Sequence, residues 1–307
     1  MSNVNLSLVK ELREKTSISM SQCIKALGES DNDLDAAIVL LKTWGALKGA
    51  EKAGKLALEG KVISIADRDL GIAVILEMNC QTDFNSKSGG FHQFCCDYLR
   101  HLQEIGDVSS DRNEKLEAER LALIAKTGEN IVVRRFDRFA NEGNENVYSA
   151  AYTHPGDKLA VIVEFGISRA ITVHDADFQA FADDVAMQIA ANAPACIRAI
   201  ELPGAIVSEQ EAIFLAQLKA EGKPEASCSK ILPGKMGKWR SEIVLFEQPC
   251  LKEPKITIDQ KRQSLEKTLG CEIMINRFVR YALGETSPKA EEKDLAADVA
   301  NMLSDDN

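Results

Sequence analysis

The segment Asn79-Cys-Gln-Thr-Asp-Phe84 has the clearest chemical potential, with a thiol, three neutral hydrogen-bonding side chains, a carboxylate and an aromatic ring in six residues. An apolar strand sequence precedes it and an amphipathic helix follows it. The segment is therefore predicted to be a strand-to-helix loop, where functional groups tend to lie. The local alternative is that Thr82 or Asp83 caps a turn and Phe84 packs beneath it. From position alone, the structural and the functional interpretation both stay open.

An internal repeat bears on this choice. Ala73–Met78 resembles Ala160–Phe165 at an offset of 87 residues, and the apolar helical pattern that begins at Phe91 recurs at Phe178 with the same offset. The period is longer than that of solenoid repeats, so we expect two copies of an α+β subdomain in which a hairpin precedes a long helix. The second copy has Gly166–Ile171 where the first has the loop, and it lacks Thr-Asp-Phe. The scaffold can therefore be built without those three residues.

Two motif-like sequences fail their own requirements. Gly49–Leu56 nearly spells a phosphate-binding P-loop, but Leu56 stands where Ser or Thr must bind Mg²⁺, and a helix is predicted before it instead of a strand. The spacing Asp31-x-Asp-x-Asp35 begins like a calcium loop, but Ala36 replaces the required glycine. Helix capping explains these acids better.

The bulk properties exclude several classes of function. The chain of 307 residues has a net charge of −10, no Cys-x-x-Cys pair among its eight cysteines, and only four histidines. Catalytic signatures such as Gly-x-Ser-x-Gly and His-Glu-x-x-His do not occur. No run approaches the roughly 20 apolar residues that span a bilayer, and Met1–Asn5 lacks the features of a secretory signal. We therefore expect a cytoplasmic protein that is not an enzyme, with no metal or cofactor and no direct nucleic-acid or membrane partner.

The elements that must position the loop begin with a predicted three-helix domain. Ser19 and Gln22 fit a capping box at the start of the second helix, and Asp31 or Asp33 can cap the third. Residues 45–60 are rich in Lys, Ala and Gly without a wide apolar stripe. They are predicted to be a tether between domains.

Turn chemistry and apolar runs outline the rest of the core. Hairpin turns are predicted at Asp67–Gly71 and His154–Lys158. Farther on, helical patterns on both sides of Gly222-Lys-Pro224 predict a helical hairpin that projects from the core; whether it makes a homodimer or another contact stays open. The remaining predictions are a short strand at 243–246, a helix at 260–269, and a strand at 273–283 that returns to the second sheet.

The C-terminal segment is distinct. From Glu285 to Asn307 it carries seven acidic residues and two lysines, a net charge of −5, yet Leu295, Val299, Met302 and Leu303 share one helical face. Such a stripe must dock on something, either its own core or a partner. The predicted parts of the chain are a three-helix domain with linker at 1–54, core subdomains at 55–140 and 141–286, the second with a helical hairpin at about 190–238, and a helical module at 287–307.

The loop sequence resembles the hallmark of the elongation factor Ts family, and Leu8–Thr16 resembles that family's N-terminal signature. The resemblance runs from end to end. Further landmarks follow in the family's order at 20–27, 45–48, 128–130, 134–135, 154 and 294–302.

This resemblance implies an α+β fold with an N-terminal three-helix domain of the ubiquitin-associated type. A core of two related subdomains with antiparallel sheets, an inserted helical hairpin and a C-terminal helix would follow. It also implies that the partner is elongation factor Tu and that the activity is nucleotide exchange on it. In that family the N-terminal domain and the core bind the GTPase domain of elongation factor Tu.

By the resemblance, Thr82, Asp83 and Phe84 would lie beside the nucleotide site of elongation factor Tu. Phe84 would act as an apolar wedge, and Asp83 would bring negative charge close to a bound diphosphate. The other contacts that the resemblance implies are Arg13, Met20, Gly128, His154, Leu295, Val299 and Met302.

The sequence departs from the family pattern at a few positions. Asn85 stands where Val is usual, Thr127 where Ile is usual, and Ser17–Ser19 where Gly-Ala-Gly is common. Losing two buried apolar contacts would cost about 1–2 kcal/mol of binding. Two other functions stay open: a protein-binding adaptor that has the same N-terminal domain but promotes no exchange, and an enzyme that uses the degenerate P-loop.

Overall fold

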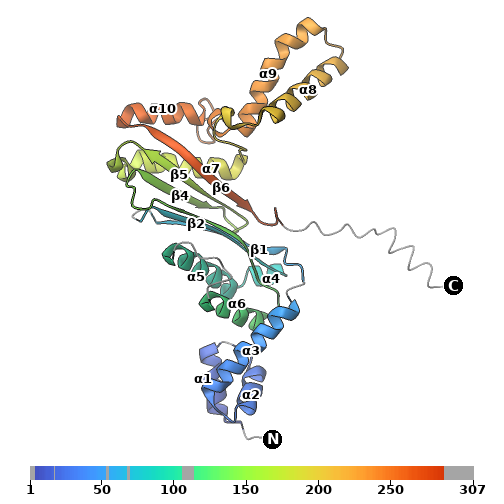
Figure 1. Cartoon of the computed structure of the whole chain (residues 1–307), viewed down its shortest axis with the longest axis vertical. Coiled ribbons are helices and arrows are strands. Elements are labelled where there is room, and N and C mark those ends of the chain that lie inside the picture. Colours follow the sequence, from blue (N-terminus) through green and yellow to red (C-terminus); the bar gives the residue numbers. More distant parts are fainter. Residues whose placement is uncertain (1–3, 17, 53–54, 68–69, 106–113, 287–307) are drawn as a thin grey trace, which may run out of the picture.

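The computed structural model describes residues 4–16, 18–52, 55–67, 70–105 and 114–286. Figure 1 shows an elongated molecule with three N-terminal helices at one end, two layered sheets in the middle and a projecting helical hairpin at the other end. The described part of the chain contains no helix that combines the length and the apolar character needed to cross a membrane. The predicted module at 287–307, with Leu295, Val299 and Met302, lies outside the described residues.

The N-terminal unit consists of α1 (Leu6–Thr16), α2 (Met20–Glu29) and α3 (Leu34–Lys52). A small apolar core joins them and includes Val9, Leu12, Cys23, Leu27 and Leu41. Asp33 caps α3 as predicted, because its carboxylate accepts the N–H of Ala36 at 2.9 Å. The predicted capping box at α2 is wrong: Ser19 makes no side-chain bond to the helix backbone and instead donates to Gln22 Oε1 at 3.2 Å.

The predicted tether at 45–60 is also wrong, because α3 continues to Lys52 and β1 begins at Glu59. Gly45 is buried against α6 (Glu114–Thr127), where an added Cβ would lie 3.0 Å from the carbonyl oxygen of Leu121. The missing side chain lets the backbones of α3 and α6 approach closely, and this tertiary packing stabilises a helical segment of low amphipathicity. The third helix thus connects the N-terminal unit to the core.

Two three-stranded antiparallel sheets form the core. The first has the order β1-β2-β3 and the second β4-β5-β6. In each sheet the central strand is apolar and is followed along the chain by a long helix. The strands are β1 (Glu59–Asp67), β2 (Ile72–Cys80), β3 (Val132–Ala140), β4 (Val147–Thr153), β5 (Leu159–Ile167) and β6 (Ile273–Ala282). The predicted hairpin turns and the predicted return of 273–283 to the second sheet are confirmed.

The sheets lie face to face between two layers of helices (Figure 1). The short α4 (Asp83–Ser86), α5 (Gly89–Ile105) and α6 lie on the side of the first sheet, and α7 (Ala176–Asn192) and α10 (Ile258–Leu269) cover the second. The two sheets meet at an apolar cluster that lies between them. It consists of Val62, Ala73, Ile75, Phe139, Ala160, Ile162 and Tyr281.

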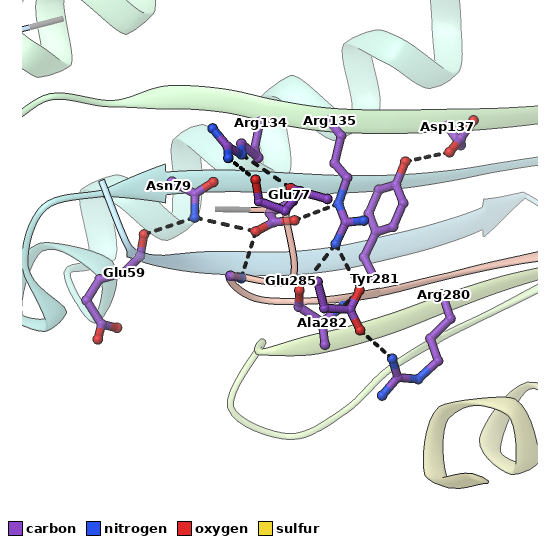
Figure 2. A network of polar contacts seen from close by, with 12 residues as sticks. Glu59, Glu77, Asn79, Arg134, Arg135, Asp137, Arg280, Tyr281, Ala282 and Glu285 are labelled. Carbon is purple, nitrogen blue, oxygen red and sulfur yellow. Dashed lines mark hydrogen bonds and ion pairs between the residues drawn. The ribbon is translucent and has the colours of Figure 1, made fainter. Parts of the chain in front are cut away.

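A network of charged side chains centred on the buried Glu77 joins the two sheets (Figure 2). Glu77 on β2 is fully buried and accepts from Arg135 Nε at 2.7 Å and from the N–H of Gly284 at 3.0 Å. The guanidinium of Arg135 also donates to Glu285 at 3.2 Å and lies over the ring of Tyr281. These contacts hold the chain after β6 against the first sheet.

The second sheet has a counterpart of this network. Glu164 on β5 accepts from Arg277 at 2.7 Å and from the side-chain amide of Asn276 at 3.2 Å. The guanidinium of Arg277 lies 4.2 Å from the ring centre of Phe139 on β3. Each sheet therefore contributes an arginine whose guanidinium lies over an aromatic ring of the other sheet.

The projecting hairpin consists of α8 (Gly204–Ala220) and α9 (Glu225–Ile243), as predicted. The predicted strand at 243–246 is wrong. Val244 makes only an isolated bridge to Cys196, and Leu245–Glu247 forms a 3-10 turn. Leu245 and Phe246 pack against the apolar core of the second sheet, which buries Leu245 fully without pairing it in a sheet.

Candidate partner-binding site

The loop at 81–84 lies at the end of β2, where the strand gives way to α4. Thr82 is the N-cap of α4, and its hydroxyl accepts the N–H of Asn85 at 3.3 Å. The local interpretation therefore holds for Thr82. It is wrong for Phe84, whose side chain does not pack beneath the turn and is 84% exposed.

Asp83 lies at the first position of α4 and is half exposed. Its carboxylate accepts from Lys87 Nζ at 2.7 Å, one helical turn away. This hydrogen bond and the positive charge of Lys87 lower the pKa of Asp83. The loop therefore presents a carboxylate and an aromatic ring side by side on the surface.

Two other exposed apolar side chains lie at the end of the first sheet where β2 ends and the loop of Phe84 begins. Leu56 and Leu58 are 54% and 43% exposed and directly precede β1, whose first residue, Glu59, is paired with Cys80. Single exposed apolar residues are common on protein surfaces, but a group of them beside a structured loop is typical of a contact surface.

The Gly128–Asn130 segment lies against the same loop. Gly128 ends α6 with φ 73°, a left-handed conformation that glycine adopts without strain. Glu129 accepts hydrogen bonds from the loop, and the N–H of Asn130 donates to Gln81 Oε1 at 3.1 Å. The role of Gly128 as a contact stays a prediction; in the structure this residue turns the chain toward the loop.

His154 reaches this end of the molecule from the second sheet. Its turn is fastened to the first sheet by an ion pair of 2.6 Å between Asp157 and Lys61 and by one of 2.7 Å between Lys158 and Glu59. The imidazole is exposed, and its Nδ1 lies 3.0 Å from the hydroxyl of Tyr152. Because Glu59 is paired with Cys80, the turn lies beside the end of β2, and the structure brings His154 to the region of the loop.

Arg13 and Met20 are not part of this group. Both are exposed on the N-terminal unit, with α3 and α6 between them and the first sheet (Figure 1). A partner that contacts both regions must therefore be large.

The thiol that directly precedes the loop is not activated for chemistry. The thiol of Cys80 is buried behind the loop, and burial, with the nearby charge of Glu129, raises the pKa of this thiol to about 12. It is therefore protonated near neutral pH and is not a nucleophile. Among the described residues, no three His, Cys, Asp or Glu side chains are placed to hold a metal ion.

The sequence alone places Glu129 only in the motif at 128–130 and does not indicate its contribution to the loop. It also does not indicate that Asp157 and Lys158 fix the His154 turn. A signal existed for Glu129, since a carboxylate that directly follows a helix-ending glycine lies on a sharp turn. Its partner loop could not be identified, because 47 residues separate Glu129 from Thr82.

Comparisons with known proteins identify the family of this chain. Residues 81–285 match the family model described as Elongation factor TS. An Elongation factor Ts from Teredinibacter turnerae is 36% identical over 302 residues, which cover 98% of this chain and 97% of that protein. Those from Nitratiruptor sp. and Bdellovibrio bacteriovorus are 36% and 33% identical, and each match covers 98% of this chain and 99% of the relative. With a family model matched over most of its length and relatives matched nearly from end to end, this chain belongs to the elongation factor Ts family.

Proposed function

We propose that this protein is a guanine-nucleotide exchange factor that binds elongation factor Tu and promotes the release of its GDP. The observation that carries the proposal is the 84% exposure of Phe84 on a loop that is otherwise well bonded to the core. Exposure of this ring gives the isolated fold no packing energy, whereas inserting it into a partner removes its apolar surface from water.

The proposed mechanism requires no covalent step. Bound GDP is held largely through Mg²⁺ and through donors around its phosphates. Phe84 would displace a structural element beside the nucleotide, and the carboxylate of Asp83 would bring negative charge toward the diphosphate. Binding and exchange are then linked: if the factor lowers the affinity for GDP, GDP lowers the affinity for the factor by the same ratio.

Further contacts with elongation factor Tu are proposed for residues away from the loop. Arg13 and Met20 would bind from the N-terminal unit, His154 from the second sheet and Gly128 from the end of α6, in addition to Thr82, which would enter with the loop. The apolar face of the C-terminal segment, formed by Leu295, Val299 and Met302, would reach a separate part of the partner. The expected location is the cytoplasm, without direct contact to nucleic acid or membrane.

The finer architecture is part of the same proposal. The two halves of the core would be copies of one subdomain. In support of this, the central strands have register irregularities at Glu77/Met78 and Glu164/Phe165, which are 87 residues apart. The N-terminal helices would be a ubiquitin-associated-type domain. A homodimer through α8–α9, where Ile206 and Ile213 are exposed, is a further proposal that sedimentation equilibrium tests.

The experiment is stopped-flow release of fluorescent GDP from elongation factor Tu. Wild-type protein is compared with Phe84→Ala, with Asp83→Ala/Phe84→Ala and with the control Leu70→Ala, which removes a 59% exposed side chain from the β1–β2 turn. We expect acceleration by the wild type and the control, and most of it lost in the Phe84 variants. Acceleration that survives the double substitution would transfer the mechanism to other contacts. No acceleration by folded wild-type protein would leave the adaptor function.

A further inference from the structure

We infer that Glu129 is a positioning residue that fixes the conformation of the Thr82–Phe84 loop before any partner is bound. The inference rests on the proposed function, because it assigns Glu129 a part in the exchange activity of that loop. It adds a residue from a distant segment of the chain, which does not itself need to touch the partner.

Both oxygens of the Glu129 carboxylate bind the loop. Oε2 accepts from the backbone N–H groups of Gln81 and Thr82 and from the side-chain amide of Asn85, each at 3.1 Å. Oε1 accepts the hydroxyl of Thr82 at 2.6 Å. Four donors from residues 81–85 thus converge on one carboxylate, and hydrogen bonds to an ionised acceptor are stronger than those between neutral groups.

The position of Glu129 is itself fixed. Its N–H donates to the hydroxyl of Thr127 at 3.3 Å, and the preceding Gly128 donates its N–H to the carbonyl of Ile124 at 2.8 Å, at the end of α6. On its other side, Asn130 is buried and donates its side-chain amide to the carbonyl of Lys55 at 2.8 Å. The carboxylate is therefore held at the end of a packed helix and is not on a free loop.

The second half of the core ties its corresponding segment differently. There the hydroxyl of Ser168 accepts the N–H of Glu272 at 2.8 Å, and the N–H of Ser168 donates to the carbonyl of Glu272 at 3.0 Å. This tie uses the backbone and a hydroxyl, where the first half uses a carboxylate. We call the four hydrogen bonds from residues 81–85 to Glu129 the carboxylate clasp. It occurs in the half of the core whose loop presents an exposed aromatic ring.

The clasp has a consequence for binding. A loop that must be ordered on binding loses conformational entropy at that step, and a preorganised loop avoids this loss. Thr82 also caps α4, on which Phe84 lies, so the bonds to Glu129 hold the base of the short helix that aims the ring. Removing the carboxylate is expected to leave the folded core intact while the ring samples unproductive orientations.

The test compares wild type with Glu129→Gln, which keeps the shape of the side chain but removes its charge and one acceptor. Glu145→Gln, in the exposed turn between β3 and β4, is the matched control. Three measurements are made on each protein: the melting temperature, the hydrogen exchange of the Gln81 and Thr82 amides, and GDP release as a function of factor concentration. Each glutamine variant is also combined with Phe84→Ala.

We expect Glu129→Gln to speed amide exchange at Gln81 and Thr82, to change the melting temperature little, and to reduce GDP-release efficiency on the order of tenfold. In the Phe84→Ala background it should have no further effect on GDP release. If the variant does not fold, Asn85→Leu, which removes one donor to the same carboxylate and keeps the Thr82 cap, replaces it.

Unchanged exchange of the Gln81 and Thr82 amides in Glu129→Gln would show that the carboxylate does not order the loop. An equal loss of activity with and without Phe84 would overturn its action through the loop. If Phe84→Ala alone leaves GDP release unchanged, the proposed role of the loop fails, whereas the amide measurement still decides whether Glu129 orders it.

Discussion

The guanidinium of Arg135 on β3 lies 3.9 Å from the ring centre of Tyr281 on β6. This contact joins strands that belong to different sheets and are separated by more than half the described core in sequence. The same guanidinium binds Glu77, and the Tyr281 hydroxyl donates to Asp137 (Figure 2). One arginine therefore neutralises a buried carboxylate and covers an aromatic ring at the interface of the two sheets.

The first prediction follows from this pair. Arg135→Met should destabilise the fold by about 3–5 kcal/mol, because it leaves the fully buried Glu77 without its charged partner. Arg277→Met is the matched control and should cost less, since Arg277 is half exposed and Glu164 is less completely buried than Glu77. Urea unfolding of both variants measures the difference. Equal destabilisation would show that burial of the carboxylate does not decide the cost.

The second prediction concerns pH. Partial burial acts to raise the pKa of Glu285, but hydrogen bonds from the N–H of Ala282 and from Arg135 and Arg280 lower it below its ordinary value of 4.5. A carboxyl with a lowered folded-state pKa contributes its full stability above the ordinary value and loses it as the pH falls through the lowered pKa. The stability difference between wild type and Glu285→Gln should therefore stay constant from about pH 7 to about pH 5 and shrink in more acidic solution. A difference that grows on acidification would contradict this assignment.

The third prediction concerns the junction of α3 and α6. Gly45→Val should cost about 1–3 kcal/mol, because its side chain would meet the carbonyl of Leu121, a backbone atom that cannot rotate away. Gly90→Val is the control in α5, where an added Cβ has open space. Thermal unfolding and limited proteolysis near 52–59 report the loosened junction. Wild-type behaviour of the Gly45 variant would mean that the two helices can separate without cost.

The fourth prediction concerns the C-terminal segment. Deleting residues 288–307 should weaken the affinity for elongation factor Tu more than it destabilises the core, because the contacts that hold the end of β6 involve residues up to Thr286. Calorimetric binding and thermal unfolding of the truncated protein test this. The substitutions Leu295→Ser, Val299→Ser and Met302→Ser, made together, keep the charge and isolate the apolar face. Unchanged affinity after truncation would assign the segment to another role.

Features decided by local sequence could be predicted. The apolar runs at 73–78 and 160–165 lie within β2 and β5, and the turn chemistry of the β1–β2 and β4–β5 connections and of the α8–α9 hairpin was sufficient to place them. Features decided by tertiary contact could not. The C-terminal half of α3 is helical because it packs on α6, and the apolar run at 243–246 is buried without joining a sheet.

The candidate site shows the same division. The loop and Phe84 could be identified from the sequence, and so could the departures from the family pattern at Asn85 and Thr127. Their physical meaning could not: the side chain of Asn85 donates to Glu129, and the hydroxyl of Thr127 accepts from the backbone of Glu129. Two polar residues in place of apolar ones thus both bind Glu129, Asn85 at its carboxylate and Thr127 at its backbone N–H, and Asn85 is 44 residues away from Glu129 in sequence.

The order of the second sheet also matters during protein synthesis. Strand β5 ends at Ile167, but its neighbour β6 begins only at Ile273, after the whole of the α8–α9 hairpin. At roughly 5–20 residues per second, a ribosome needs roughly 5–20 seconds to make the intervening chain. Throughout that interval the nascent β5 has one unpaired edge, and such edges invite association with other chains. All three strands of the first sheet have been made once Ala140 is added. The apolar face of that sheet can then cover the apolar face of β4 and β5 while β6 is still missing.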